Sequence, residues 1–497
     1  MSSIDRQNIW KTIPQKGFLG HPKGLFTLFF TEFWERFSYY GMRAILVFYM
    51  YYEVSKGGLG LDKSTALSIM SIYGSLVYMS GIIGGWVADR LLGTSKSVFY
   101  GGVLIMFGHI ALAIPGNFAF FLVSMVLIIL GTGLLKPNVS SVVGDIYSPE
   151  DRRRDSGFSI FYMGINLGGF LSPLIVGEVG MKHNFHLGFS IAAIGMFIGL
   201  ILFVVTKKKN LGQAGAYVAN PLPSEDKKKI FTWIGIGTII LALIFIFTIK
   251  IGYMDFKRFI TLVGILGILI PAGYFIAMYR SPKTTDVERS RLLAYIPLFI
   301  ASVMFWAIQE QGSTILANYA DERTQLHFAG FDLSPAWFQS LNPLFIITLA
   351  PVFAWLWIKL GNREPSIPKK FSLGILFAGL SFIIILLPAY LGGTDSLVNP
   401  LWLVLSYFVC VLGELCLSPV GLSATTKLAP KAFSAQTMSL WFLSNAAAQA
   451  INAQIVKFYR PETEMVYFGT IGVIAILLSI TLFLLSPKIE KFMKGVH

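Results

Sequence analysis

Four ionisable residues lie within one apolar segment near the start of the chain. Residues 25–52 are long enough to cross the hydrocarbon core of a membrane, yet they contain Glu32, Glu35, Arg36 and Arg43. Each charge would cost roughly 2.5 to 3.5 kcal/mol at the bilayer centre if it faced lipid. On a helix, these four residues share about one third of the circumference, so they must face protein or water. Carboxylates beside an arginine can exchange that cation for a proton, and a charged ligand can compete for it.

Three further ionisable residues interrupt later apolar segments. Lys136 precedes Pro137 in GTGLLKPNVSS, Glu310 lies in FWAIQEQGST, and Glu414 lies in LGELCLSPVG. Pro137 interrupts helical hydrogen bonding and can expose backbone to a cavity. Intramembrane charges of this kind indicate a functional site. Two other interpretations stay open: Lys136 could snorkel to a membrane face, and Glu414 could belong to a purely structural ion pair.

The composition indicates an all-α integral membrane protein. Apolar residues make up 55% of the chain and charged residues only 13%, against roughly 25% charged residues in a typical soluble protein. Apolar segments of about 20 residues recur along the chain, and they predict fourteen transmembrane helices.

The polar segments between these helices divide the chain into two halves and an insertion. We expect a six-helix bundle at 25–206, an inserted helix pair at 230–279 and a second six-helix bundle at 294–486. The connecting polar stretches are linkers at 207–229 and 280–293, with terminal segments at 1–24 and 487–497. The intramembrane charges fall only in the two groups of six. We therefore expect function to lie between the bundles, as in transporters whose halves rock around a midplane site.

The distribution of basic residues predicts the orientation of the chain. Most of the 40 Lys and Arg residues fall on one side if the N-terminus is inside, which puts both termini in the cytoplasm of a multi-pass cell-membrane protein. Residues 1–24 show no signal-peptide pattern. The clusters 152–154, 207–209 and 227–229 account for most of the +14 net charge, and we expect anionic lipid, not nucleic acid, as their partner.

Cysteine and histidine spacing gives no support for a metal site or another cofactor. Cys410 and Cys416 are six residues apart in one apolar segment, a spacing that does not bring helical side chains together. His109 is a lone histidine in an apolar segment, and we interpret it as a packing residue.

Three local motifs identify a family resemblance. GGWVADRLLGTSKS at 84–97 resembles the loop signature of the major facilitator superfamily, in which Asp89 would cap or pair with neighbouring helices. EFWERFSYYG at 32–41 resembles the ExxERFxYYG motif of the proton-coupled oligopeptide transporters, and FYMGINLG at 161–168 resembles that family's second signature. The second signature departs at Gly169-Phe170, where Ser-Leu is usual. The likeness covers essentially the whole chain and implies a major facilitator fold of the prokaryotic type, with two extra central helices.

The resemblance implies a proton-driven importer of di- and tripeptides that works by alternating access. Arg36 and Lys136 match the positions that bind the peptide carboxylate, and Glu414 matches the position that receives the ammonium. Other polar and aromatic residues could hydrogen-bond the peptide or form walls around its side chains, although each could instead be a helix-packing residue. They are Tyr39, Tyr40, Tyr78, Asn166, Asn342, Trp306 and Trp441.

The same resemblance assigns proton coupling to carboxylates. Glu310 matches the proton-linked gate residue, and Arg43 would be its partner. Glu32 and Glu35 flank Arg36, so protons and the substrate carboxylate would compete for one cation. The alternative is that these three residues only neutralise one another.

Other functions remain open at this point. A relative of the same fold could carry nitrate, another small anion or an amino acid, and an exporter would use the same residues. An intramembrane enzyme is disfavoured because no H-E-x-x-H, G-x-S-x-G or paired-aspartate motif lies in a span. A membrane sensor is disfavoured because no soluble output domain is visible. We expect a monomer to be functional.

Overall fold

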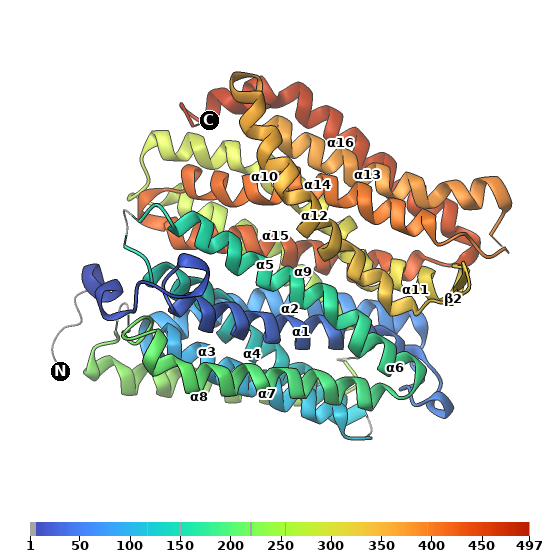
Figure 1. Cartoon of the computed structure of the whole chain (residues 1–497), viewed down its shortest axis with the longest axis horizontal. Coiled ribbons are helices and arrows are strands. Elements are labelled where there is room, and N and C mark those ends of the chain that lie inside the picture. Colours follow the sequence, from blue (N-terminus) through green and yellow to red (C-terminus); the bar gives the residue numbers. More distant parts are fainter. Residues whose placement is uncertain are drawn as a thin grey trace.

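The fold is almost entirely helical (Figure 1). The computed structural model describes residues 6–116, 118–148, 151–218, 221–253, 255–394 and 396–496. In this part of the chain the only sheet is a short hairpin in which β1 (His327–Phe328) pairs antiparallel with β2 (Phe331–Asp332).

The first bundle consists of seven helical segments that form six long rods. A π-helical turn at Pro173–Gly177 joins the fifth and sixth segments into one rod. Their bounds are α1 Gly24–Tyr51, α2 Lys63–Val87, α3 Thr94–Ala113, α4 Phe118–Asp145, α5 Arg154–Ser172, α6 Glu178–Lys182 and α7 Phe185–Asn210.

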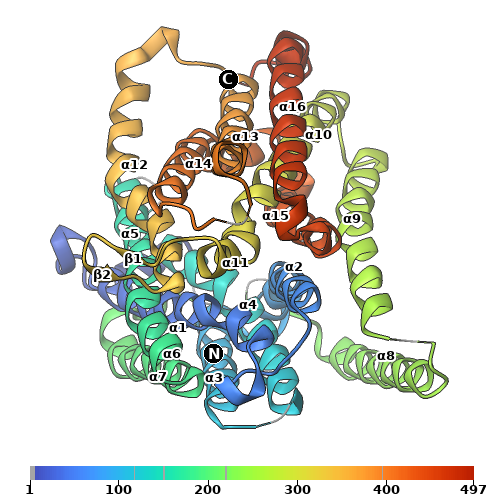
Figure 2. The ribbon, with the colours of Figure 1, turned by 90° about the vertical axis from the view of Figure 1, so that its right-hand side faces the viewer.

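The second bundle repeats this plan after an inserted pair. The pair is α8 (Ser224–Lys250) and α9 (Phe256–Arg280); α9 packs against α2 and α15, whereas α8 stands apart from both bundles in Figure 2. The first rod of the second bundle breaks at a 3-10 turn, Glu310–Ser313. The helices are α10 Asp286–Gln309, α11 Ile315–Glu322, α12 Leu341–Leu360, α13 Ile367–Gly392, α14 Leu401–Leu428, α15 Ser434–Ile455 and α16 Glu464–Phe492.

The fourteen predicted spans each contain a helix, and the architecture of two bundles with an inserted pair is confirmed. Within the described residues, eleven helices are long and apolar enough to cross a membrane by themselves. α1 is not among them because every stretch of 18 residues in it holds at least three of its charges. α15 is rich in Ser, Asn and Gln, and the side chains of several α8 residues lie outside the described part.

Several helices extend beyond the apolar segments that predicted them. α7 continues to Asn210, α8 begins at Ser224 and α10 begins at Asp286. At the start of α10, Thr285 and Glu288 form a capping box, in which each side chain accepts from the other residue's backbone N–H. Polar capping residues allow a helix to continue beyond the membrane. The hydrophobicity of the sequence does not predict such extensions.

Close contacts between helices at glycines set the position of the charged residues. A Cβ on Gly84 of α2 would lie 1.8 Å from the carbonyl oxygen of Gly133 on α4. A Cβ on Gly168 of α5 would lie 2.5 Å from the carbonyl oxygen of Phe33 on α1. Only glycine permits such close approach of two backbones. The glycine of the second signature therefore brings α5 against the face of α1 that carries Arg36.

Pro137 lies inside α4, which continues without a break from Phe118 to Asp145. The amide of Asn138 donates to the carbonyls of Leu134 and Gly84, at 2.7 and 3.3 Å, and so ties α4 to α2 at this level. This packing holds the helix together where the proline removes a hydrogen bond.

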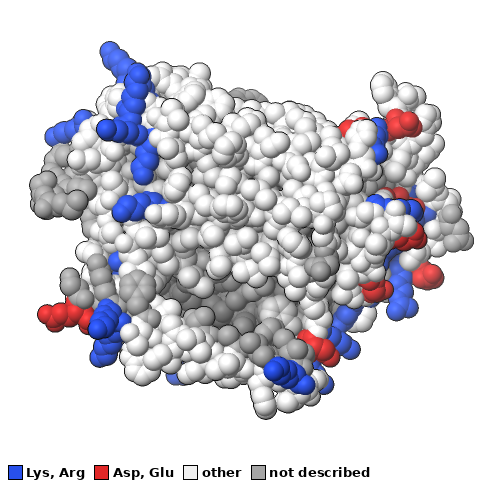
Figure 3. Space-filling view, turned by 90° about the horizontal axis from the view of Figure 1, so that it is seen from below, with Lys and Arg blue, Asp and Glu red and all other residues white. Residues whose placement is uncertain are grey.

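Basic residues gather at the end of the molecule that carries both ends of the described chain (Figures 1 and 3). Between the two ends, the face in Figure 3 shows a broad band without Lys, Arg, Asp or Glu colouring. Arg153, which we expected at a lipid surface, donates to Asp151 and to the carbonyls of Gln15 and Gly20. Hydrogen bonds from Arg153 lower the pKa of Asp151. This arginine fastens the N-terminal segment to the first bundle.

Candidate functional site

Arg36 lies in a buried cluster with two carboxylates on α1. Its guanidinium pairs with Glu35, at 2.6 Å for one of the two contacts, and with Glu32 at 3.2 Å. All three residues are at most 2% exposed. The rings of Tyr39 and Tyr40 lie 5.1 and 5.8 Å from the guanidinium carbon. The predicted grouping is present, and here both carboxylates share the cation.

Arg43 and Glu310 form an ion pair that joins the two bundles. Arg43 also donates to the hydroxyl of Ser313 at 2.8 Å, so it contacts both ends of the 3-10 turn between α10 and α11. The pairing of Arg43 with Glu310 was expected, and both residues are at most 7% exposed. Such a buried pair holds the bundles together as long as both partners remain charged.

Neutral donors surround Glu310 as well. The amides of Asn445 and Gln449 on α15 donate to its carboxylate at 3.0 and 2.7 Å. Tyr78 of α2 donates at 3.4 Å. The carboxylate therefore keeps hydrogen-bond partners besides its arginine.

Lys136 has a different environment. Its ammonium lies 4.3 Å from the ring centroid of Tyr78, a cation–π contact. Within the described residues it has no carboxylate within ion-pair distance and no hydrogen-bond acceptor. The ammonium is thus half-buried on α4 without an anion.

Glu414 has the complementary environment on α14. Its carboxylate accepts from Asn342 of α12 at 2.8 Å and from Gln309 of α10 at 3.2 Å, and it has no cationic partner among the described residues. Glu414 and Lys136 do not form an ion pair in this conformation. A buried carboxylate without a cation can bind an ammonium group.

The remaining predicted residues are placed less directly. Asn166 donates to the carbonyl of Tyr162 one turn earlier, at 3.0 Å. Trp306 packs edge to face on Phe305, and its indole nitrogen has no partner within the described residues. Trp441 is only 5% exposed, because it fills the space beside Gly421. Their predicted roles as peptide contacts stay predictions.

Sequence reasoning missed the amide side chains that hold the two carboxylates of the second bundle. Asn445 and Gln449 are one helical turn apart in NAAAQAIN, and this spacing was the available signal. Gln309, beside Glu310, points its amide at Glu414 and accepts a hydrogen bond from the thiol of Cys410 at 3.2 Å. Nothing in the sequence near Cys410 indicates this contact.

A second set of missed contacts joins the bundles at the end opposite the chain termini. Tyr51 and Tyr52 at the end of α1 donate to the two oxygens of Asp321 on α11, at 2.7 and 2.8 Å. Lys63 at the start of α2 pairs with Glu322. We call these contacts of Asp321 and Glu322 the outer clasp.

The charged side chains of the site do not balance. Arg36, Arg43 and Lys136 supply three positive charges, whereas Glu32, Glu35, Glu310 and Glu414 supply four negative charges if all are ionised. One bound proton makes the set neutral. Such an arrangement suits the exchange of protons and charged ligands, and no group of metal-binding residues occurs among the described residues.

Comparison with known sequences places these residues in a family context. A sequence model of the POT family matches residues 95–474. The chain is 66% identical over 496 residues to the uncharacterized transporter YclF of Bacillus subtilis, covering 100% of both chains. It is 48% identical over 498 residues to the di-/tripeptide transporter of Lactococcus lactis subsp. cremoris, covering 99% of this chain and 100% of that one.

Solved structures agree with this assignment. A peptide transporter POT in complex with sulfate has a TM-score of 0.97 at 72% identity, covering 99% of this chain and 100% of that one. A POT family transporter in complex with 5-aminolevulinic acid has a TM-score of 0.93 at 48% identity, covering 97% and 99%. The expected major facilitator architecture is therefore confirmed, and the chain belongs to the POT family of membrane transporters.

Proposed function

We propose that this protein imports di- and tripeptides together with protons across the cell membrane and catalyses no covalent chemistry. The observation that carries the proposal is a pair of charges that have no counter-ion within the described residues, Lys136 in the first bundle and Glu414 in the second. A peptide in its zwitterionic form carries both complementary charges. The names of the relatives, a di-/tripeptide transporter and a peptide transporter, support the same substrate class.

In this proposal, the termini of the peptide bridge the two bundles. The carboxylate binds Lys136 and shares Arg36 with its two glutamates, while the ammonium binds Glu414. The termini of extended di- and tripeptides are roughly 7 to 10 Å apart. Since the charged contacts are with the termini, the peptide side chains contribute little to recognition, and the transporter accepts many sequences. Tyr39, Tyr40, Tyr78, Asn166, Asn342, Trp306 and Trp441 are the proposed further contacts.

Proton coupling acts through the contacts between the bundles. A proton on Glu310 removes the charge that attracts Arg43, while Asn445, Gln449 and Tyr78 still solvate the carboxyl group. The outer ends of the bundles can then separate, which changes the side of the membrane from which the site is open. Protons on Glu32 or Glu35 release Arg36 for the substrate carboxylate. No other cofactor is needed.

The proton gradient and the membrane potential set the inward direction of transport, in the proposed orientation with both termini in the cytoplasm and a monomer as the functional unit. One positive charge that enters down a potential of 100 mV supplies about 2.3 kcal/mol. This is enough for accumulation on the order of tens-fold.

Uptake of labelled dialanine into proteoliposomes tests the proposal. We expect accumulation when an inward proton gradient is imposed and only equilibration when a protonophore collapses it. Unlabelled dialanine should compete, whereas nitrate should not. Accumulation of nitrate or of a free amino acid, without transport of dialanine, would contradict the substrate assignment but leave the family assignment intact.

A further inference from the structure

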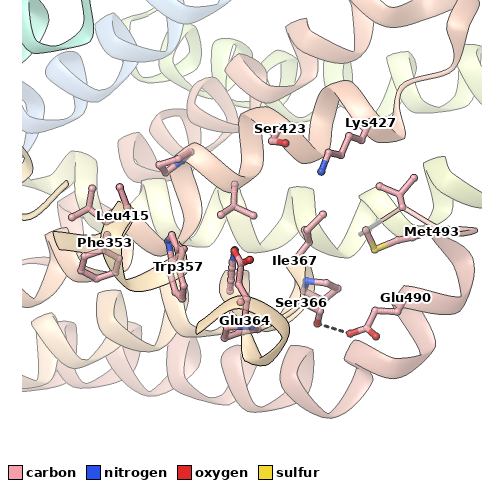
Figure 4. Close-up of a pocket in the computed structure, with 18 of the residues that line it drawn as sticks. Phe353, Trp357, Glu364, Ser366, Ile367, Leu415, Ser423, Lys427, Glu490 and Met493 are labelled. Atoms are coloured by element: carbon pink, nitrogen blue, oxygen red, sulfur yellow. Dashed lines mark hydrogen bonds and ion pairs between the residues drawn. The ribbon is translucent and has the colours of Figure 1, made fainter. Parts of the chain in front are cut away.

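A cavity of about 610 Å³ lies in the second bundle between α12, α13, α14 and the end of α16 (Figure 4). Met493 and Val496, near the end of the chain, line it, so it lies toward the termini side of the membrane. None of the charged residues of the transport site lines it. Its volume falls within the range of roughly 300 to 1,000 Å³ that is typical of small-molecule pockets.

The two ends of this cavity differ in polarity. At one end lie Phe353 of α12 and Leu415 of α14, which belong to a small apolar cluster beside Val411. At the other end lie Lys427 and Glu490, as Figure 4 shows. The apolar end lies deeper in the membrane than the charged end. Leu415 is in the middle of α14, and Lys427 is about three helical turns farther along, at the end of the helix. The lining therefore changes from apolar to charged toward the membrane face.

Two cations and two carboxylates from four different segments line the cavity from its middle to its charged end. Lys370 in the first turn of α13 pairs with Glu364 in the loop before it, and its ammonium lies 4.5 Å from the ring centroid of Trp357. Glu490 of α16 accepts a hydrogen bond from the hydroxyl of Ser366 at 2.5 Å. Lys427 of α14 is exposed. We call these four charged side chains, those of Lys370, Lys427, Glu364 and Glu490, the rim of the cavity. Their charges sum to zero.

A rim with both signs of charge selects against ligands with only one. The carboxylates of Glu364 and Glu490 repel an anionic headgroup, and Lys370 and Lys427 repel a cation. A headgroup that carries both a phosphate and a primary ammonium matches the carboxylates and the lysines at once. Its ammonium N–H groups can donate to the carboxylates, while the lysines donate to its phosphate. The apolar end is suited to an acyl chain.

From this two-part lining, we propose that the cavity binds a glycerophospholipid whose headgroup carries a phosphate and a primary ammonium. The lipid enters beside α12, in which only 6% of the residues of an 18-residue apolar stretch are buried and which exposes Val352, Trp355 and Ile358. The bound lipid separates the termini-side half of α12 from α14.

Native mass spectrometry of the full-length protein, released from nanodiscs of three lipids, tests this proposal by binding alone. The lipids are phosphatidylethanolamine, phosphatidylcholine with a quaternary nitrogen, and phosphatidylglycerol without an ammonium. We expect one retained phosphatidylethanolamine and about tenfold weaker retention of the other two. Lys427→Gln and Glu490→Gln should each weaken phosphatidylethanolamine retention about tenfold. Lys491→Gln, next to Glu490 but outside the cavity lining, is the matched control and should have no effect.

Two further arms separate the sources of the ligand. Ala350→Phe, which fills the apolar end without changing a charge, should weaken lipid retention in protein that still transports peptide. Free phosphoethanolamine has the same headgroup but no acyl chain and should bind at least about tenfold more weakly. Equal retention of the three lipids, preference for phosphatidylglycerol, an equal effect of Lys491→Gln, or tight binding of free phosphoethanolamine would each overturn the proposal. None of these outcomes bears on peptide transport.

Discussion

Glu310 and Glu414 are both buried carboxylates of the second bundle, but in the part of the chain that the structure describes only Glu310 has a cationic partner. Glu310 pairs with Arg43 of the first bundle and also accepts from Asn445 and Gln449. Among the described residues, the donors to Glu414 are two neutral amide groups of its own bundle, those of Asn342 and Gln309. The first carboxylate therefore connects the bundles, and the second leaves its charge available to a ligand.

The comparison extends to the cations of the first bundle. Arg36 and Arg43 are both neutralised by glutamates, whereas the ammonium of Lys136 lies over the ring of Tyr78 and has no carboxylate partner among the described residues. Among the intramembrane charges named above, each bundle thus contributes one that has no counter-ion within the described residues, Lys136 and Glu414, and the two are opposite in sign. A buried charge without a counter-ion is costly, and a zwitterionic ligand between the bundles removes the cost on both sides at once.

The largest effect should follow from Glu310→Gln. The amide keeps the shape but loses the charge that attracts Arg43, and its single oxygen can accept from only one of the two α15 side chains, Asn445 or Gln449. Breaking a buried ion pair changes the energy of the paired state by about 3 to 5 kcal/mol, so accumulation driven by a proton gradient should fall at least about 20-fold. Peptide exchange, which needs no net proton movement, should survive. Both are measured in proteoliposomes over a range of external pH.

Wild-type uptake should rise as the external pH falls, whereas uptake by Glu310→Gln should be flat. Glu53→Gln, which changes an exposed carboxylate near the same end of α1, serves as the control and should retain the wild-type profile. A steep pH dependence in Glu310→Gln would exclude this residue as the coupling site and assign coupling to Glu32 and Glu35.

Glu414→Gln should act on substrate binding instead of coupling. Loss of one hydrogen bond between charged groups costs about 1.5 to 3 kcal/mol, which corresponds to a rise in half-saturation concentration of roughly 10- to 150-fold for dialanine. An analogue that lacks the amino group cannot use Glu414, so the variant and the wild type should exchange it equally well. Competition assays with both ligands, on the wild type and on the variant, measure these half-saturation concentrations. An equal loss for both ligands would show that Glu414 supports the fold and does not recognise the ammonium.

The charged face of α1 and the Arg43–Glu310 pair could be predicted from the sequence, for different reasons. The first follows from the cost of charge in lipid and the helical period, which are local properties. The second spans 267 residues, and only the family resemblance indicated it. Pairing over such a distance depends on how the bundles meet, and no local pattern encodes this.

The residues that prediction missed are neutral or lie near the ends of helices. Asn445, Gln449 and Gln309 are uncharged, so they give no signal of unfavourable burial in a lipid environment. Asp321 lies in α11, beyond the 3-10 turn that breaks the rod, and its tyrosine partners resemble ordinary interfacial aromatic residues. Prediction also missed the parts of helices that extend beyond the apolar segments, because capping residues such as Thr285 are polar.

Asn342→Leu should weaken dialanine binding less than Glu414→Gln does, and it tests whether Asn342 positions Glu414. The variant removes the 2.8 Å hydrogen bond to Glu414 and leaves Gln309 as its donor. A single hydrogen bond contributes about 0.5 to 1.5 kcal/mol net, so the half-saturation concentration for dialanine should change by roughly 2- to 12-fold. If Asn342 acts only through the Glu414 carboxylate, the double variant with Glu414→Gln should be no worse than Glu414→Gln alone, whereas a direct contact with the peptide would add a further loss. Strictly additive losses in this cycle would contradict such a positioning role.

The smallest effect should come from Lys63→Gln in the outer clasp. Lys63–Glu322 joins the same two bundles as Arg43–Glu310, but its side chains are 39% exposed on both partners, against 9% and 7% for the deeper pair. Exposed ion pairs contribute about 0.2 to 1 kcal/mol, because water and salt screen them. Proton-driven uptake should therefore change less than about fivefold, and the change should disappear in high salt. If Lys63→Gln instead abolished uptake as Glu310→Gln does, burial would not decide which ion pair controls opening, and the outer clasp would be the gate.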